Sequence, residues 1–526
     1  MKKIYLTLFF VLAYFLPVMS QDIELEKTYE ISGKAKKGNL GNAEFDVKSG
    51  NYVLTYVTKA NDKMAKFEIL YFDKDFNFLK TDIQELEFEV GKVKFPWWKF
   101  KSEEYSIDGV SADPNASNRL VLRKYNITYK YNWLWGYPIP KYKLLDKVKL
   151  TNDEGEKYYL LARLQDFDNG DLYVLCRSTG KQLHLLKINK NLDVVKDLEI
   201  KTTYDQFVVF SKEIIDKDAN FKEMIFLLAP SKEGNATDPD KTRYTFLRYD
   251  NSLTLIDDIT FNSKSSFWDV NDIILSDKPD EFFIYGPSAA GKDKYYDQLI
   301  GTEKFKAFQV MKINDHKVEY LTETNLDIFK SKLKTPPSQR KAPDYEGKKF
   351  DLAEDKILGN GDLLITGQNW GGKFNAISGN REFTYKDIVG FHFDSKGNLV
   401  SQFGIDCKEN SGENMTPQIL VESPDGKKVF WLIQEVKGVK GEGIGFQLAG
   451  IPQFSSLLKK RLLTYPRMGR IDIATDQISD FTTYGNEKFF IDNNFPLLPV
   501  PSEKKLVLFG ANKAGDVIWF GRIRMD

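Results

Sequence analysis

The sequence contains only two cysteines, Cys176 and Cys407, and only three histidines among its 526 residues. So few cysteines exclude a fold framed by disulfides, and three scattered histidines do not assemble a zinc site. The two cysteines could pair in an oxidising compartment. A large core folds without such a bond, however, so we predict two unpaired thiols.

The sequence also lacks an excess of charge of either sign. Its 75 Lys and Arg residues balance 75 Asp and Glu residues, so the basic footprint of a nucleic-acid-binding protein is absent. The most apolar run, Ile4–Phe15, is shorter than the roughly 20 residues that span a bilayer as a helix. We therefore expect no nucleic acid partner and no transmembrane segment.

The N-terminus has the pattern of a secretory signal peptide. Two lysines precede the apolar run, and small residues around Val18 and Ser20 precede the polar Gln21. This order of basic, apolar and small residues predicts a signal peptide over residues 1–20, cleaved after Ser20. The mature protein is then expected to be secreted or periplasmic.

The dominant pattern of the remaining chain is a repeat. A short apolar strand ends in Asp or Asn, a turn of two to four polar residues follows, and a second apolar strand begins. The copies recur roughly every 60 to 80 residues, a spacing longer than that of WD40 and kelch repeats. They are Tyr71–Asp73, Lys187–Asn189, Arg248–Asp250, Lys312–Asn314, His392–Asp394 and Arg522–Asp526, with a looser copy between Asp472 and Ile478.

Each copy follows a strongly apolar segment, which we interpret as the inner strand of a propeller blade. Seven such strands, and one unit hidden in the long gap between the first two copies, predict eight blades, with seven as the alternative. Leu120–Leu122 and Tyr142–Leu150 are the expected strands of the hidden unit. The seven strands are Tyr52–Tyr56, Leu172–Cys176, Met224–Leu228, Phe282–Tyr285, Leu363–Thr366, Val429–Ile433 and Leu506–Phe509.

The last copy reaches Asp526 without the second strand of its hairpin. Soluble proteins normally pair or cover such an edge, so we predict that Ile23–Ile31 pairs with Val517–Met525. The expected fold is an all-β propeller, closed by the N-terminal strand beside the C-terminal hairpin. Residues 21–526 form one domain in this prediction, with loop insertions at about 93–106, 332–348 and 437–461.

The strand and hairpin pattern over about residues 22–526 resembles secreted or periplasmic bacterial β-propellers in general. No WD dipeptide, kelch Gly-Gly pair or Asp-box recurs, so no functional residues of a particular family can be transferred to this chain.

Motifs for cofactors are weak. Gly286–Lys292 has the glycine and lysine spacing of a phosphate-binding loop, but Asp293 stands where such a loop needs Ser or Thr. Asp166–Asp171 contains three carboxylates, but their register does not fit an EF-hand. We expect no cofactor and no metal, with calcium an unsupported possibility, and no residue is assigned a catalytic role.

Aromatic residues make up 14% of the chain, and two clusters do not fit the strand pattern. These clusters contain Trp97, Trp98, Trp133, Trp135 and Tyr137. Such side chains can form a stacking surface for sugars or a protein hot spot, or they can fill an irregular blade.

We expect an exported, non-enzymatic binding or scaffold protein that contacts a protein or a glycan through one loop face. The alternative is a glycan-acting hydrolase with carboxylates at the central channel.

Overall fold

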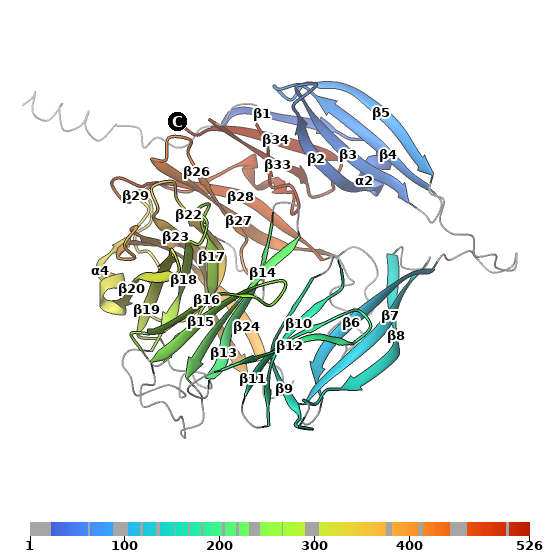
Figure 1. Cartoon of the computed structure of the whole chain (residues 1–526). Coiled ribbons are helices and arrows are strands. Elements are labelled where there is room, and N and C mark those ends of the chain that lie inside the picture. Colours follow the sequence, from blue (N-terminus) through green and yellow to red (C-terminus); the bar gives the residue numbers. More distant parts are fainter. Residues whose placement is uncertain are drawn as a thin grey trace, which may run out of the picture.

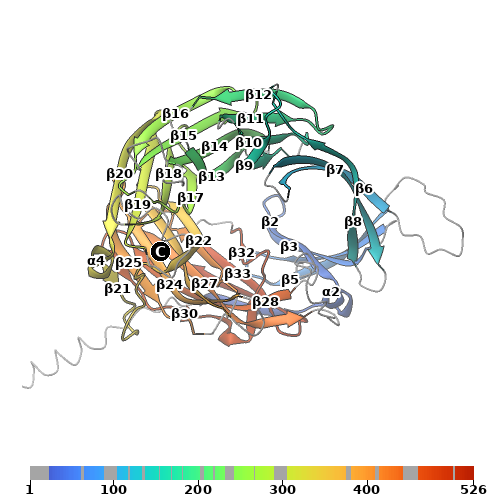
Figure 2. The same cartoon turned by 90° about the horizontal axis from the view of Figure 1, so that it is seen from below.

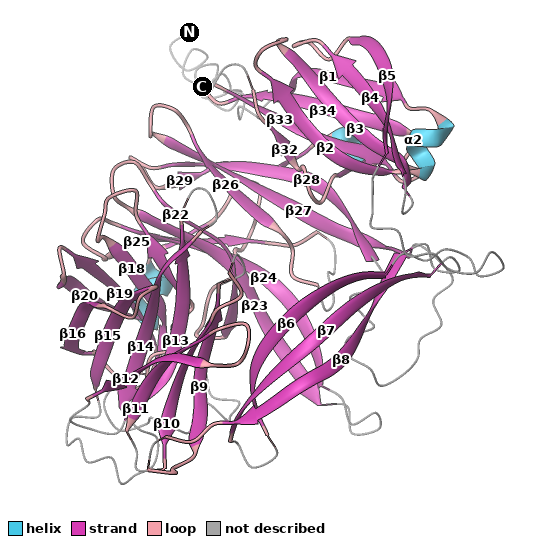
Figure 3. Ribbon diagram, turned by 45° about the vertical axis from the view of Figure 1, so that its right-hand side comes forward, coloured by secondary structure: helices cyan, strands magenta, loops and turns pink. Residues whose placement is uncertain are grey.

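The computed structural model describes residues 23–526, apart from 61–63, 88–103, 116–118, 133–136, 153, 167–168, 180–181, 202–205, 217–219, 231–241, 266, 290–304, 375–380, 409–413, 442–459 and 501–503. The described residues are almost entirely strands (Figure 3). Three short helical segments interrupt them: α2 (Gly33–Lys37), α4 (Leu326–Ser331) and the 3₁₀ turn η2 (Gly485–Glu487).

These strands form eight sheets, in which all pairs are antiparallel except that of β21 with β25. The first four sheets are β2–β5 (Asn39–Asp46, Asn51–Ala60, Met64–Phe72, Phe78–Glu87), β6–β8 (Glu104–Pro114, Leu120–Asn132, Tyr137–Lys149), β9–β12 (Tyr158–Gln165, Leu172–Ser178, Leu183–Ile188, Val194–Ile200) and β13–β16 (Gln206–Ile215, Phe221–Pro230, Arg243–Asp250, Leu255–Asn262). The next three are β17–β20 (Asp272–Leu275, Phe282–Ser288, Ala307–Asn314, Lys317–Asn325), β21–β25 (Leu333–Lys334, Lys349–Ile357, Leu363–Phe374, Arg381–Phe393, Leu399–Ile405) and β26–β30 (Gln418–Glu422, Lys428–Gly441, Lys460–Asp472, Gln477–Ile478, Thr482–Thr483). The last combines β31–β34 (Phe489–Ile491, Leu497–Leu498, Lys505–Asn512, Val517–Arg524) with β1 (Ile23–Glu30).

The sheets follow one another around a ring (Figures 1 and 2). In Figure 2, β9, β13 and β17 lie on the inner side of the ring, and β12, β16 and β20 lie on the outer side. Adjacent sheets share buried apolar clusters from β6–β8 around to the closing sheet and on to β2–β5. The prediction of an all-β propeller is confirmed, whereas the number of blades stays a prediction.

The predicted closure is confirmed by the pairing of β1 with β34, in which Thr28 lies opposite Trp519 and Glu30 opposite Val517. The indole N–H of Trp519 donates to the carboxylate of Glu26 at 2.6 Å. Alternate residues of β1 are half-buried and exposed, as expected for a strand with one face against a core. The two ends of the described chain therefore complete one sheet.

The seven strands that we expected to be inner strands are instead second strands, because each sheet places a further strand on the inner side. The strand β18 is an example, since β17 pairs with its inner edge and β19 with its outer edge. Second strands are buried on both faces and read as continuous apolar runs, whereas the inner strands are more polar and gave a weaker signal. The hidden unit corresponds to the β6–β8 sheet, where Leu120–Leu122 begins β7 and Tyr142 lies in β8.

The repeat has a structural role that its sequence did not reveal. A basic residue two positions before the repeated Asp or Asn binds an acidic residue at or near the start of the second strand, which fixes the two strands across their turn. These ion pairs are Lys187–Asp171 (3.3 Å), Arg248–Glu223 (2.6 Å), Lys312–Glu281 (3.0 Å) and His392–Asp362 (3.0 Å). The most regular positions of the repeat are therefore structural.

Several other predictions can be located on the structure. Both cysteines are free, Cys176 buried and Cys407 partly buried, which confirms the prediction of unpaired thiols. Of the expected insertions, residues 93–103 and 442–459 lie outside the description, and 332–348 contain the short strand β21. The predicted signal peptide, 1–20, also lies outside it. No helix among the described residues is long and apolar enough to cross a bilayer.

Candidate ligand-binding site

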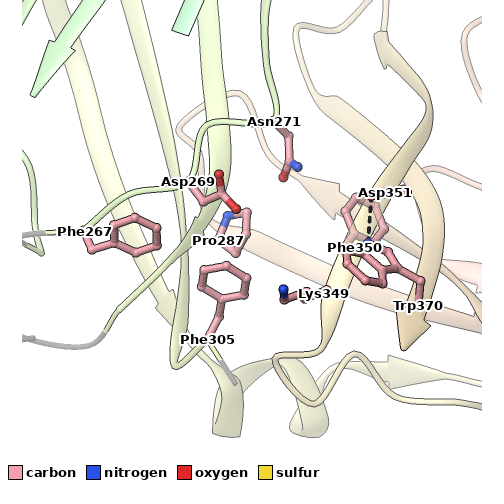
Figure 4. A pocket seen from close by; sticks show the side chains of 9 residues that line it. All are labelled: Phe267, Asp269, Asn271, Pro287, Phe305, Lys349, Phe350, Asp351 and Trp370. Atoms are coloured by element: carbon pink, nitrogen blue, oxygen red, sulfur yellow. Dashed lines mark hydrogen bonds between the residues drawn. The ribbon is translucent and has the colours of Figure 1, made fainter. Parts of the chain in front are cut away.

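A cavity of about 210 Å³ lies between the β17–β20 sheet and the β21–β25 sheet (Figure 4). Its walls combine aromatic rings with two carboxylates, an amide and an ammonium group. The lining residues are Phe267, Asp269, Asn271, Pro287, Phe305, Lys349, Phe350, Asp351 and Trp370.

The segment that precedes β17 forms one wall of the cavity. The backbone N–H of Asp269 donates to the carbonyl of Pro287, and that of Asn271 donates to the carbonyl of Tyr285, both at 2.9 Å. This pairing extends β17 along β18, and alternate residues of a strand point to the same face. Asp269 and Asn271 therefore both line the cavity (Figure 4).

Gly286 makes this close approach of the two chain segments possible. A Cβ atom at this position would lie 1.9 Å from the carbonyl oxygen of Asp269, so no other residue fits without moving that wall. The first glycine of the Gly286–Lys292 motif therefore serves strand packing beside the cavity.

The opposite wall is built on β22 and β23. Lys349 lies opposite Trp370 in the register of these strands, and its Nζ is 5.0 Å from the centroid of the indole. The indole N–H of Trp370 donates to Asp351 Oδ1 at 2.8 Å, and the hydroxyl of Tyr385 donates to Asp351 Oδ2. These contacts fix the orientation of the carboxylate and of the aromatic wall.

The two polar side chains of the wall before β17, Asp269 and Asn271, differ in their environment. Burial of the carboxyl group raises the pKa of Asp269, and the positive charge of Lys349 opposes this rise. The surface of Asp269 is open to the cavity, where solvent screens such effects. The side-chain oxygen of Asn271 is buried and has no hydrogen-bond partner among the described residues.

The aromatic side chains give the cavity flat apolar surfaces. Phe267 and Phe305 are buried and parallel, with ring centroids 6.2 Å apart. Ligand pockets for drug-sized molecules typically measure about 300–1,000 Å³, so a cavity of about 210 Å³ accommodates a small ring or one end of a larger ligand. Aromatic faces with hydrogen-bonding groups between them suit a ring that has an apolar face and polar edges.

A second group of carboxylates lies farther along the same strands. Burial and the nearby charge of Asp272 raise the pKa of Asp355, against a hydrogen bond donated by Tyr285 that lowers it. Burial and the charge of Asp355 also raise the pKa of Glu354. Lys212, on the inner strand β13, donates to Asp272 at 2.7 Å. Inner strands thus bring acidic residues together beside the ring interior.

Metal coordination finds no support in the described part of the chain. No group of three or more His, Cys, Asp or Glu side chains is arranged to hold an ion there. Each histidine contacts an aspartate instead: His184 contacts Asp197 at 2.8 Å, His316 contacts Asp257 at 2.5 Å, and His392 contacts Asp476 at 2.8 Å.

None of the aromatic residues singled out in the sequence is among the described residues that line this cavity. Trp97, Trp98, Trp133 and Trp135 lie outside the described residues, and Tyr137 is the first residue of β8. The cavity residues were missed because they are isolated positions in different repeats. The one available signal was Trp370, which precedes two glycines directly after a strongly apolar strand.

Comparisons with known proteins identify no family. No family model matches the sequence, and no curated protein matches it. Solved structures with a related arrangement include a lignostilbene dioxygenase from Pseudomonas brassicacearum, with 8% identity, a TM-score of 0.32 and coverage of 82% of this chain and 97% of that chain. The WD40 domain of SCAP from fission yeast has 9% identity, a TM-score of 0.24 and coverage of 95% and 98%.

The dihydro-heme d1 dehydrogenase NirN has 8% identity and a TM-score of 0.27, and the match covers 84% of this chain but 66% of that chain. At these values the comparisons carry no functional argument. The assignment of this chain as a β-propeller rests on its sheet topology and on the closure by β1.

Proposed function

We propose that the protein is an exported binding protein that holds a sugar ring of a glycan in the cavity between the β17–β20 and β21–β25 sheets. The observation that carries the proposal is the composition of the cavity, which places Trp370 and Phe305 around Asp269, Asn271 and Lys349.

A sugar matches these groups one by one. Its C–H face packs against an aromatic ring, and its hydroxyl groups donate to the carboxyl oxygens of Asp269, which lines the cavity. Lys349 supplies a donor for a ring or hydroxyl oxygen. Since Asp351 is already oriented by Trp370 and Tyr385, the aromatic wall is preorganised, which lowers the cost of binding.

Glycan-array screening followed by calorimetric titration tests this proposal. We expect Trp370→Ala to weaken binding by about 2 kcal/mol, typical of a hot-spot aromatic residue, or about 30-fold in Kd. Asp277→Asn, on the exposed turn between β17 and β18, is the matched control for Asp269→Asn. The proposal fails if no glycan binds the wild type, or if Trp370→Ala and Asp269→Asn bind as tightly as the control.

Hydrolysis of the bound glycan is the second candidate function, and one observation favours it. The cavity contains two carboxyl groups in unlike environments, because burial raises the pKa of Asp269 while Asp351 accepts two hydrogen bonds. Such pairs divide the roles of acid and base in glycosidases. A loss of hydrolysis in Asp269→Asn that exceeds its loss of binding by about 10²-fold or more would support catalysis, and absence of any glycan cleavage by the wild type would exclude it.

A protein ligand on a loop face remains part of the proposal for the aromatic clusters. Trp97, Trp98, Trp133, Trp135 and Tyr137 are the candidate contacts there. If alanine variants of these residues bind every tested glycan and partner as the wild type does, the clusters have no part in recognition.

A further inference from the structure

Half of the large apolar side chains that are exposed among the described residues lie on two strands, β5 and β8. On β5 the most exposed is Ile83 at 67%, and on β8 it is Tyr142 at 58%. The others on these strands are Phe78, Leu79, Leu86, Leu144 and Leu145. Single exposed apolar residues are ordinary, but concentrations of them mark contact surfaces.

Both strands are the last in their sheets. Within the described residues β5 pairs only with β4, and β8 pairs only with β7, so each has one edge with unpaired backbone groups. The sheet that ends in β8 has three strands, whereas the sheets before and after it in the chain have four. Figures 1 and 3 show both strands at the outer margins of their sheets.

The two strands carry opposite charge. The residues of β5 include Asp82, Glu85 and Glu87 with one lysine, and β8 includes four lysines with Asp146 as its one acid. Among the described residues Lys143 and Lys147 take part in no salt bridge, whereas Glu85 binds Lys66 and Asp82 binds Lys80. No acidic partner among the described residues therefore compensates the charges of Lys143 and Lys147.

Other outer strands carry fewer exposed large apolar residues, with Val194 and Val195 on β12 and Leu255 on β16. β20 carries none of the exposed large apolar residues, and β25 is covered by β21. Charged residues normally protect an edge from pairing, but alternating apolar side chains with charge of one sign select a partner edge of the opposite sign.

We propose that β5 of one copy of this chain pairs with β8 of a second copy, which adds a fourth strand to the β6–β8 sheet. The contact buries Ile83 against Tyr142 and Leu144, which share one face of β8, and it brings the acidic side chains of β5 to the lysines of β8. Backbone hydrogen bonds along the joined edges supply affinity, and the opposite charges set the choice of edges. Since every copy has both edges, two copies can join reciprocally or more copies can join in series.

Disulfide cross-linking tests the contact directly. A copy with Ile83→Cys is mixed with a copy that carries Leu144→Cys, and the products are separated on a non-reducing gel. We expect a cross-linked species from this mixture. In the control mixture the second copy carries Val47→Cys in place of Leu144→Cys. Val47 is 85% exposed and lies at a turn away from both edges, so this mixture should give no comparable product.

Sedimentation analysis with charge variants supplies the second readout. We expect self-association that weakens with added salt and weakens at least 10-fold in the double variant Lys143→Glu with Lys147→Glu. Mixing that variant with a copy carrying Asp82→Lys and Glu85→Lys should restore association. A wild type that stays monomeric at about 100 µM, or association that persists unchanged in the charge variant without the cross-link, would overturn the proposal.

Discussion

Replacement of His392 by phenylalanine is predicted to weaken the junction between two neighbouring sheets in a pH-dependent way. His392 is only 2% exposed, and its two ring nitrogens contact Asp362 at 3.0 Å and Asp476 at 2.8 Å. Asp362 belongs to the β21–β25 sheet and Asp476 to the turn between β28 and β29 of the next sheet. His392→Phe leaves both carboxylates without this partner.

The magnitude follows from the burial of the three groups. Removing one member of a buried charged pair costs about 3–5 kcal/mol. The side chains of Asp362 and Asp476 are 14% and 20% exposed and keep some contact with water, so we expect about 3 kcal/mol, near the lower end. His316→Phe is the matched control, because the side chain of His316 is 51% exposed and its loss should cost less than about 1 kcal/mol.

The sign of the pH dependence follows from the shift in pKa. Burial acts to lower the pKa of His392, but the hydrogen bonds and charges of Asp362 and Asp476 outweigh it, and the pKa is raised. Protonated His392 stabilises the folded state through both aspartates. This stabilisation is fully present below the pKa of an unfolded histidine, about 6.5, and it is lost as pH rises through the pKa of His392 in the folded state. The difference in the free energy of unfolding between wild type and His392→Phe should therefore be largest near pH 6 and should become smaller toward pH 9.

Urea unfolding followed by tryptophan fluorescence at several pH values from 6 to 9 measures this difference. A loss of stability below about 1 kcal/mol near pH 6, or a difference that grows as pH rises, would refute the assignment of His392 as a charged residue that joins the two sheets.

Three further predictions concern the closure, the core and the cavity wall. Deletion of residues 21–31 removes the β1–β34 pairing and should lower the melting temperature of the whole ring, and an unchanged value in calorimetry would contradict the closure. Tyr345→Phe should leave stability unchanged or raise it by up to about 1 kcal/mol, because the buried Tyr345 hydroxyl has no partner among the described residues; a loss above 1 kcal/mol in urea unfolding would show a hidden partner. Gly286→Ala should displace Asp269 and reduce glycan binding more than 10-fold in calorimetry, and wild-type affinity would show that the wall does not position the ligand.

Much of the fold could be predicted because two kinds of local signal are strong. Second strands such as β10 are buried on both faces and appear as unbroken apolar runs. The turns after the third strands β4, β11, β15 and β24 begin with Asp or Asn, whose side chain accepts from the turn backbone. Asp394 is an example, since its carboxylate accepts from the N–H groups of Lys396 and Asn398. The closure by β1 followed from the unpaired hairpin at the other end of the chain.

The cavity could not be predicted, for a physical reason. Asp269 and Lys349 lie far apart in the sequence and meet only because two sheets pack side by side. Asp269 lies just before β17 and Lys349 is the first residue of β22, so neither residue stands out against other turns and edges. The contribution of Gly286 is equally invisible in sequence, since it depends on the carbonyl of Asp269 in a neighbouring segment.

A crystal structure of the protein with a glycan identified by array screening tests the central claim most directly. The account predicts a sugar ring in the cavity between the β17–β20 and β21–β25 sheets, packed on Trp370 and hydrogen-bonded to Asp269 or Asn271. A glycan bound elsewhere, with the cavity empty, would contradict it.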